Sequence, residues 1–250
     1  MTELLNLGPA ELTALAGIAF IAGVIRGFTG FALSAVAMTA AVFYLPPVEI
    51  IPMLWWLEIT ASVLMIRSGW TEADKRIGFG LAAGSVIGLP LGLWLTLSIP
   101  QDVSKIAALV LISALAATQL ARLRLPFLAT RVGLGASGLT AGITTGLSGA
   151  GGMVVALYTL ALDKPGRVIR ASLILYLTVS LCVSFFTHLI IGTMDATAIW
   201  RGLVLAVPTA AGVVLGKWMF IPRYEPYYKP ICLVLLIALA LAGLAREFAT

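Results

Sequence analysis

Long stretches of the chain carry no charged side chain, and this feature limits its possible folds more than any other. Four uncharged runs of 22, 25, 31 and 24 residues cover 27–48, 77–101, 132–162 and 171–194. A helix needs about 20 apolar residues to span the hydrocarbon core of a bilayer. The runs are continuous, whereas the strands of a membrane β-barrel alternate apolar and polar residues in segments of about ten. The pattern therefore predicts an all-α integral membrane protein in contact with the lipid bilayer.

The composition excludes a soluble domain and several classes of function. The chain is 60% hydrophobic and 11% charged, whereas soluble domains are about 45–50% apolar and about 25% charged. Its net charge of +5 comes from basic residues scattered between the apolar runs, so we expect no nucleic acid partner. Cys182 and Cys232 lie in apolar runs without a Cys or His at metal spacing. We therefore expect both cysteines to be small residues of the core, and we expect the protein to bind no metal and no cofactor. The start of the chain carries Glu3 and no basic residue, so we count the first segment as mature structure rather than a signal peptide.

Two glycine patterns recur in the same order in both halves of the chain. One aligns at a shift of 119 residues and the other at a shift of 124, and a shared order is better evidence of duplication than any single glycine match. The aligned pairs are Gly23 with Gly142, Gly27 with Gly146, Gly30 with Gly149, Pro46 with Pro165, Gly88 with Gly212, Gly92 with Gly216 and Trp94 with Trp218. We therefore predict a single membrane domain, residues 1–250, made of two homologous halves at about residues 10–124 and 130–246.

Each half begins with an apolar stretch that is broken by glycines. The first stretch covers 10–45 and is broken at 27–30; the second covers 132–162 and is broken at 146–152. Each is too long for one upright span and short for two, so it is either a single broken crossing or a re-entrant hairpin that returns to its starting side. Three full helices are expected to follow in each half, at about 48–67, 77–97 and 104–122, and then at 169–190, 198–218 and 228–246.

The positions of lysine and arginine favour the hairpins, because cytoplasmic loops carry an excess of basic residues. Hairpins place twelve basic residues on one side and three on the other, whereas single crossings divide them eight to seven. The larger set is Arg67, Lys75, Arg76, Arg122, Arg124, Arg131, Lys164, Arg167, Arg170, Lys217, Arg223 and Lys229, and the smaller set is Lys105, Arg201 and Arg246. We therefore predict two inverted repeats, each a re-entrant helical hairpin plus three transmembrane helices, with both termini periplasmic.

Inverted repeats with paired, glycine-broken helices are typical of secondary transporters, which bind their substrate where the broken helices meet near the midplane. The second arm of each hairpin begins at the tip, so its free N–H groups and positive dipole end would face the membrane centre, and Thr29 and Ser148 are suitable N-caps. Two such ends facing each other would bind an anion. The candidate substrate-binding residues are Arg26, Gly27, Phe28, Thr29, Gly30, Gly146, Leu147, Ser148, Gly149, Ala150, Gly151, Gly152 and Arg170. Rocking of one repeat against the other would then alternate access to the site.

Three ionisable residues each have two interpretations. Arg26 lies at bilayer depth and either binds an oxyanion with its planar donor fork or pairs with Glu58, the only carboxylate well inside an apolar run. Glu58 in turn either carries a coupling proton or accepts a structural hydrogen bond. Arg170 begins the helix after the second hairpin and either forms part of a vestibule or extends to the membrane interface. The six tryptophans are expected to lie mainly in the interfacial belt.

One motif points to an enzyme. The segment 146–149 matches the G-x-S-G of rhomboid-type intramembrane serine proteases, and His188 lies downstream. The first half has Gly and Thr at the matching positions of 27–30, which the duplicated hairpin explains better than a nucleophile does. Ser148 and His188 are also expected to differ in depth by about 14 Å, at 1.5 Å per residue, too far for a base and its nucleophile. We therefore expect no enzyme; an anion channel, which would share the site of a carrier, is the closer alternative.

The two hairpin motifs, 23–31 and 142–152, together with the turns Pro46-Pro47 and Lys164-Pro165 and the segment 170–172, resemble the TauE/SafE sulfite exporter (TSUP) family of bacterial membrane transporters. This resemblance implies a small anionic sulfur-containing substrate, such as sulfite, sulfoacetate or another organosulfonate, exported across the bacterial inner membrane. An inside-negative potential favours anion exit by about 2.3 kcal/mol per charge per 100 mV, so export would need no coupled proton. Whether the protein forms a homodimer is left open.

Overall fold

The computed structural model describes residues 5–123, 125–162, 164–219 and 225–249. Every regular element in these ranges is helical, and seven helices (α2, α4, α5, α6, α9, α10 and α11) are long and apolar enough to cross a membrane. The prediction of an all-α membrane protein is confirmed. Arg124 and Arg223 of the larger basic set lie outside the described residues. The elements are α2 (Pro9–Thr29), α3 (Leu33–Ala41), α4 (Pro47–Glu72), α5 (Lys75–Ser98), α6 (Gln101–Leu120), the 3-10 turn η1 (Pro126–Ala129), α7 (Arg131–Ser148), α8 (Gly151–Leu160), α9 (Gly166–Ile191), α10 (Ala196–Met219) and α11 (Glu225–Ala249).

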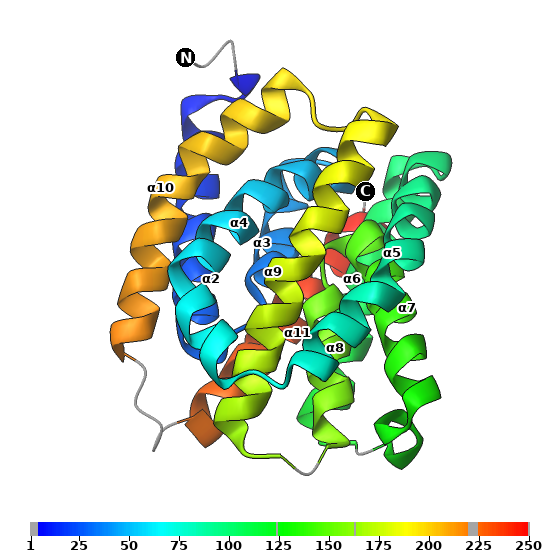
Figure 1. Cartoon of the computed structure of the whole chain (residues 1–250). Helices are drawn as coiled ribbons and strands as arrows, with labels where there is room; N and C mark the ends of the chain where they lie inside the picture. The colour runs from blue at the N-terminus through cyan, green and yellow to red at the C-terminus, as the bar shows by residue number, and fades with distance from the viewer. Residues whose placement is uncertain (1–4, 124, 163, 220–224, 250) are drawn as a thin grey trace.

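The order of elements is the same in the two halves of the chain. A broken pair, α2 and α3 or α7 and α8, precedes three long helices in each half. Figure 1 shows α3 and α8 turning back inside the bundle. The start of α4 lies near the N-terminus, because Arg201 contacts both Leu5 and Glu49. The end of α4 lies near the start of α9, where Asp74 is 2.9 Å from Lys164. The first hairpin is thus followed by a helix that begins near the N-terminus, and the second by a helix that begins at the opposite end of α4. The inverted relation of the two repeats and their orientation in a membrane stay predictions.

The two halves are interlocked through glycines. The first arm of each hairpin packs on the second long helix of the other half, so that α2 lies along α10 and α7 lies along α5. A Cβ atom on Gly23 would lie 2.5 Å from the carbonyl oxygen of Thr209, and one on Gly142 would lie 2.7 Å from the amide nitrogen of Leu89. Only glycine lets two helix backbones approach this closely. Other glycines of the aligned pattern make the same kind of backbone contact at these two seams: Gly27, Gly88, Gly92, Gly146, Gly212 and Gly216.

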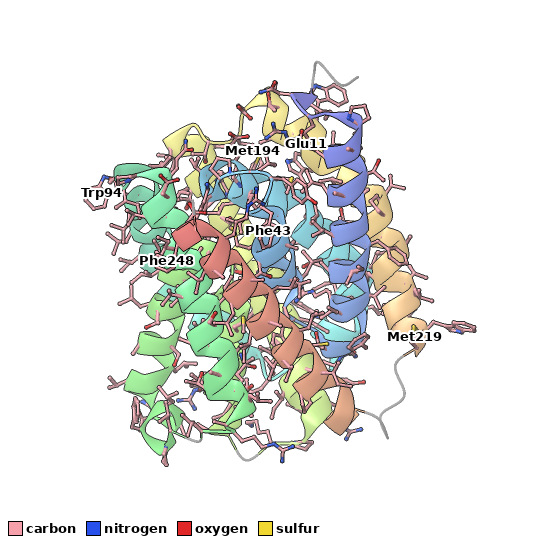
Figure 2. The ribbon with its side chains drawn as sticks, turned by 180° about the vertical axis from the view of Figure 1, so that it is seen from behind. Glu11, Phe43, Trp94, Met194, Met219 and Phe248 are labelled. Atoms are coloured by element: carbon pink, nitrogen blue, oxygen red, sulfur yellow. The ribbon has the colours of Figure 1, made fainter. Side chains whose placement is uncertain are left out.

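The short helices α3 and α8 are almost wholly buried, and the long helices surround them. The outer helices present large apolar side chains to the exterior, as Trp94 and Met219 do in Figure 2. Trp55 and Trp56 pack on each other with ring centres 5.1 Å apart and are half-buried on α4; the interfacial belt of tryptophans stays a prediction. Of the two cysteines, Cys232 is buried as expected, whereas Cys182 lies on an exposed face of α9.

Candidate functional site

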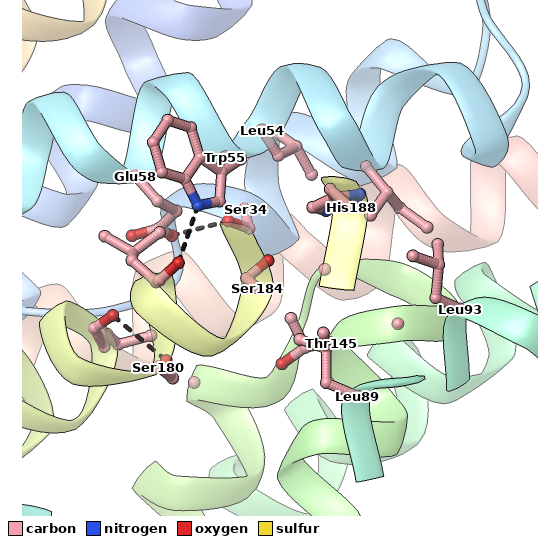
Figure 3. Close-up of a pocket in the computed structure, with 16 residues that line it drawn as sticks. Ser34, Leu54, Trp55, Glu58, Leu89, Leu93, Thr145, Ser180, Ser184 and His188 are labelled. Carbon is pink, nitrogen blue, oxygen red and sulfur yellow. Dashed lines mark hydrogen bonds between the residues drawn. The ribbon is translucent and has the colours of Figure 1, made fainter. Parts of the chain in front are cut away.

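A small cavity lies where α4 and α9 meet the tips of the two hairpins (Figure 3). It offers about 50 Å³ to the centres of water molecules, and one water needs about 10–15 Å³ on that measure. The space therefore suits a few waters or one small ion. Its polar side chains are Ser34, Glu58, Thr145, Ser180, Ser184 and His188, and its other lining residues are Ile51, Leu54, Trp55, Leu89, Leu93, Gly146, Gly149, Gly152, Leu177 and Leu181.

Each first arm ends at a glycine in the left-handed backbone conformation. Gly30 has φ of 83° after α2, and Gly149 has φ of 69° after α7, a geometry that glycine adopts without the steric penalty of a Cβ atom. Thr29 and Ser148 are therefore the last residues of α2 and α7. Their hydroxyls donate to the carbonyl oxygens four residues earlier, at 2.8 Å and 3.0 Å. The prediction that Thr29 and Ser148 cap the second arms is wrong, because neither α3 nor α8 has a side-chain cap. The hydroxyl of Thr29 also bonds to Phe31, but that residue lies before α3 begins.

The second arms begin without any side-chain cap. The N-cap residues of α3 and α8 are Ala32 and Ala150, so the first N–H groups of both helices have no side-chain acceptor. Ser34 in the first turn of α3 and Gly152 in the first turn of α8 both line the cavity. The two tips touch, because a Cβ atom on Gly149 would lie 3.4 Å from the Cβ of Ser34. Two positive helix ends therefore meet at one cavity.

Arg26 forms an ion pair and does not line the cavity. Its side chain is fully buried, and Nη2 lies 3.3 Å from Oε2 of Glu58. Nη1 donates to the carbonyl oxygen of Gly30 at 2.6 Å, at the C-terminal end of α2. Of the two interpretations of Arg26, the pair with Glu58 is the one present in the structure, and it offsets the cost of burying either charge alone.

Glu58 connects this pair to the cavity. Its Oε1 accepts a hydrogen bond of 2.6 Å from the hydroxyl of Ser34, and its carboxylate forms part of the cavity wall in Figure 3. The structural hydrogen bond that was one interpretation of Glu58 is thus present. Because Arg26 lies behind the carboxylate, the negative charge that Glu58 would present to the cavity is compensated. Coupling to a proton through Glu58 stays a prediction.

Arg170 holds the tip of the first hairpin. It is the fifth residue of α9, and its Nη2 donates to the carbonyl oxygen of Gly27 at 2.7 Å. Its aliphatic stem packs against Gly30, where a Cβ atom would lie 2.8 Å from Cγ of Arg170. Arg26 and Arg170 therefore both bond to carbonyl groups at the C-terminal end of α2, where cations stabilise the negative end of the helix dipole.

The family model described as "Sulfite exporter TauE/SafE" matches residues 15–243. The chain belongs to the TauE/SafE sulfite exporter family. Neither curated proteins nor solved structures gave a match. Family membership confirms the resemblance carried by the tip motifs and implies a multi-pass membrane exporter of sulfite or a related anion.

The cavity of this TauE/SafE protein includes only part of the predicted site. Of the predicted residues, Gly146, Gly149, Gly152 and Glu58 line it. The other candidates lie around the tips without lining it: Arg26, Gly27, Phe28, Thr29, Gly30, Leu147, Ser148, Ala150, Gly151 and Arg170. Their role in substrate binding stays a prediction.

The sequence interpretation missed most of the polar wall of the cavity. Ser180, Ser184 and His188 are spaced four residues apart, which places them on one face of α9. Thr145 lies at the position that the shift of 119 aligns with Arg26, so the second half has a hydroxyl where the first half has a guanidinium. The spacing on α9 and the alignment of Thr145 with Arg26 are the two signals in the sequence that point to this wall.

The protease motif is not assembled into a catalytic pair. The hydroxyl of Ser148 donates to the carbonyl of Thr144 and lies outside the cavity. Nδ1 of His188 lies 2.7 Å from the hydroxyl of Thr193, at the far end of α9. Among the described residues, no hydrogen bond joins Ser148 to His188.

Proposed function

We propose that the protein exports a small sulfur-containing oxyanion, such as sulfite or an organosulfonate, and binds it in the cavity between the hairpin tips. The observation that carries this proposal is the meeting of two uncapped helix N-termini at one ion-sized space. Free N–H groups at a helix start, with the positive end of the dipole, form an anion site. Family membership supports an anion of the sulfite type. We place the protein in the bacterial inner membrane, with both termini periplasmic.

The side chains of the cavity suit an oxyanion because they can donate hydrogen bonds. Thr145 and Ser180 donate to carbonyls of their own helices, at 2.8 Å and 3.2 Å, and such hydroxyls can rotate toward a ligand that offers a better acceptor. Ser184 and His188 lie on the same wall of α9. Apolar neighbours such as Leu89 and Leu93 keep the local dielectric low, which strengthens each of these hydrogen bonds.

Arg26 supports anion binding indirectly in this scheme. An unpaired carboxylate about 4 Å from a bound anion would repel it by about 4 kcal/mol at an effective dielectric of about 20. The ion pair with Arg26 removes most of this repulsion. Arg26 is therefore a positioning residue that keeps Glu58 neutralised, rather than a direct ligand.

The glycine seams indicate which helices move together during alternating access. Close backbone contacts join α2 to α10 and α7 to α5, and each contact crosses the boundary between the sequence halves. Rocking one sequence repeat against the other would break both seams. We infer that two mixed bodies move instead, one containing α2 and α10 and the other containing α5 and α7, with the cavity between them.

Efflux of radiolabelled sulfite from proteoliposomes tests the proposal. We expect saturable efflux with counterflow, and we expect Ser184→Val to slow it at least tenfold while Phe186→Val, on an exposed face of the same helix, leaves it unchanged. Unitary currents without counterflow would instead identify an anion channel. Equal rates in liposomes with and without the protein, for sulfite and for organosulfonates, would overturn the proposed function.

A further inference from the structure

A second, larger cavity opens at the end of the molecule where the N-terminus lies. We call it the polar vestibule; its polar residues include Glu49, Thr193, Asp195 and Arg201, and it offers about 340 Å³ to the centres of water molecules. Arg201 closes one side of it. Its Nη1 donates to Glu49 at 2.6 Å and its Nε donates to the carbonyl oxygen of Leu5 at 2.7 Å, which ties the start of α10 to the start of α4.

Two helices line both the polar vestibule and the central cavity. On α4, Pro52 faces the vestibule, and Ile51 and Leu54 line the cavity. On α9, His188 lines the cavity, and Thr193, just past the end of the helix, lines the vestibule. One helical turn rises 5.4 Å, so the partition between the two spaces is about one turn thick.

One side-chain contact on the α9 side joins a residue of the central cavity to a residue of the polar vestibule. Nδ1 of His188 lies 2.7 Å from the hydroxyl of Thr193. The backbone beneath it is fixed, because the N–H groups of Gly192 and Thr193 both donate to the carbonyl oxygen of His188, at 2.9 Å and 3.1 Å. Gly192 has φ of 81°, which turns the chain sharply so that Thr193 faces back toward His188. The imidazole can therefore leave this contact by side-chain rotation while the helix end stays in place.

We propose that His188 and Thr193 form the gate between the central cavity and the polar vestibule, through which the anion leaves the protein. This inference rests on the proposed function for its physiological meaning. The ion pair of Arg201 with Glu49 keeps the opposite wall of the vestibule fixed, so that opening the gate requires the His188–Thr193 hydrogen bond to break and no separation of α10 from α4.

Labelling of a cysteine in the cavity tests the gate without any anion. Ser184→Cys serves as the reporter in a chain whose two native cysteines, Cys182 and Cys232, are replaced by serine and alanine. A membrane-impermeant thiol reagent is added to vesicles of either orientation. We expect His188→Ala to raise the labelling rate at least tenfold, only in vesicles that expose the N-terminal end of the bundle.

Two further variants keep the test decisive. Thr193→Val keeps the shape of the side chain but removes the hydrogen bond, so it should raise the labelling rate in the same vesicles, and it replaces His188→Ala if that variant does not fold. Leu189→Ala, on an exposed face next to His188, should leave the rate unchanged. Unchanged labelling in Thr193→Val would overturn the gate. Faster labelling in these variants, together with no anion transport by the native chain, would uphold the gate and reject the proposed function, so the two failures are distinguishable.

Discussion

The seam between α5 and α7 can be tested with two glycines of the same helix. A Cβ atom on Gly142 would lie 2.7 Å from the amide nitrogen of Leu89 and 2.9 Å from Cα of Ser85, both backbone atoms. A Cβ atom on Gly135 meets nothing within 4 Å. Since ordinary Cβ contacts begin at 3.4 Å, Gly142→Ala must push the two helices apart by about 0.7 Å, whereas Gly135→Ala disturbs no neighbour.

The two substitutions should therefore change the free energy of unfolding in opposite directions. Replacing glycine by alanine inside a helix stabilises it by about 0.5–1 kcal/mol through reduced backbone entropy in the unfolded chain. Overpacking a close contact costs about 1–3 kcal/mol. We expect Gly135→Ala to raise the unfolding free energy by about 0.5–1 kcal/mol and Gly142→Ala to lower it by about 1–2 kcal/mol.

Equilibrium unfolding in mixed micelles with increasing dodecyl sulfate, followed by far-ultraviolet circular dichroism, measures this difference. The same comparison of two glycine-to-alanine variants can be repeated on α2, in the other half of the chain. A Cβ atom on Gly23 would lie 2.5 Å from the carbonyl oxygen of Thr209, whereas one on Gly17 would meet nothing within 4 Å. If Gly142→Ala were as stable as Gly135→Ala, the helices would not touch through their backbones, and the inference that α5 and α7 move as one body would fail.

Two further predictions concern charged residues. Arg26→Ala leaves the carboxylate of Glu58 buried without its partner and should lower the unfolding free energy by about 3–5 kcal/mol. In the same micelle assay, the double variant Arg26→Ala with Glu58→Gln should recover part of this loss. If the double variant recovered none of it, the two side chains would not be coupled. The hydrogen bond from Lys164 is the main cause that lowers the pKa of Asp74 below its ordinary value of 3.8, against the opposing effect of burial. A carboxylate with a lowered pKa stabilises the fold above its unfolded pKa, and this contribution disappears as the pH falls through the folded pKa. Unfolding midpoints measured from about pH 5 to about pH 3 should therefore fall less steeply in Lys164→Met than in the native chain; identical profiles would contradict this role of the pair.

The helices of this protein were predictable because the signals for them are local. Uncharged runs of membrane-spanning length marked the long helices, and α9 at Gly166–Ile191 lies within a few residues of the expected 169–190. The breaks at Gly30 and Gly149 were also predictable, since glycine adopts the left-handed conformation that ends a helix.

The details of the site depended on choices that spacing does not determine. Thr29 and Ser148 have side chains that can cap the next helix or bond back to their own, and in this fold they bond back. The orientation of Arg26 depended on whether Glu58, 32 positions later, faced the same side of the bundle. Ser184 and His188 could be predicted to line the cavity only if the inward face of α9 were known. That face is determined by the packing of α9 against α4.

The central claim is that an oxyanion binds between the two hairpin tips, and the position of a bound heavy analogue tests it most directly. Selenite has the charge and shape of sulfite and carries an anomalous scatterer, so crystals of the protein grown with selenite would locate the anion. We predict one selenium peak in the cavity, within hydrogen-bonding distance of the first-turn N–H groups at Ser34 and Gly152. A peak elsewhere, such as beside Arg201 in the polar vestibule, with none between the tips would contradict the account.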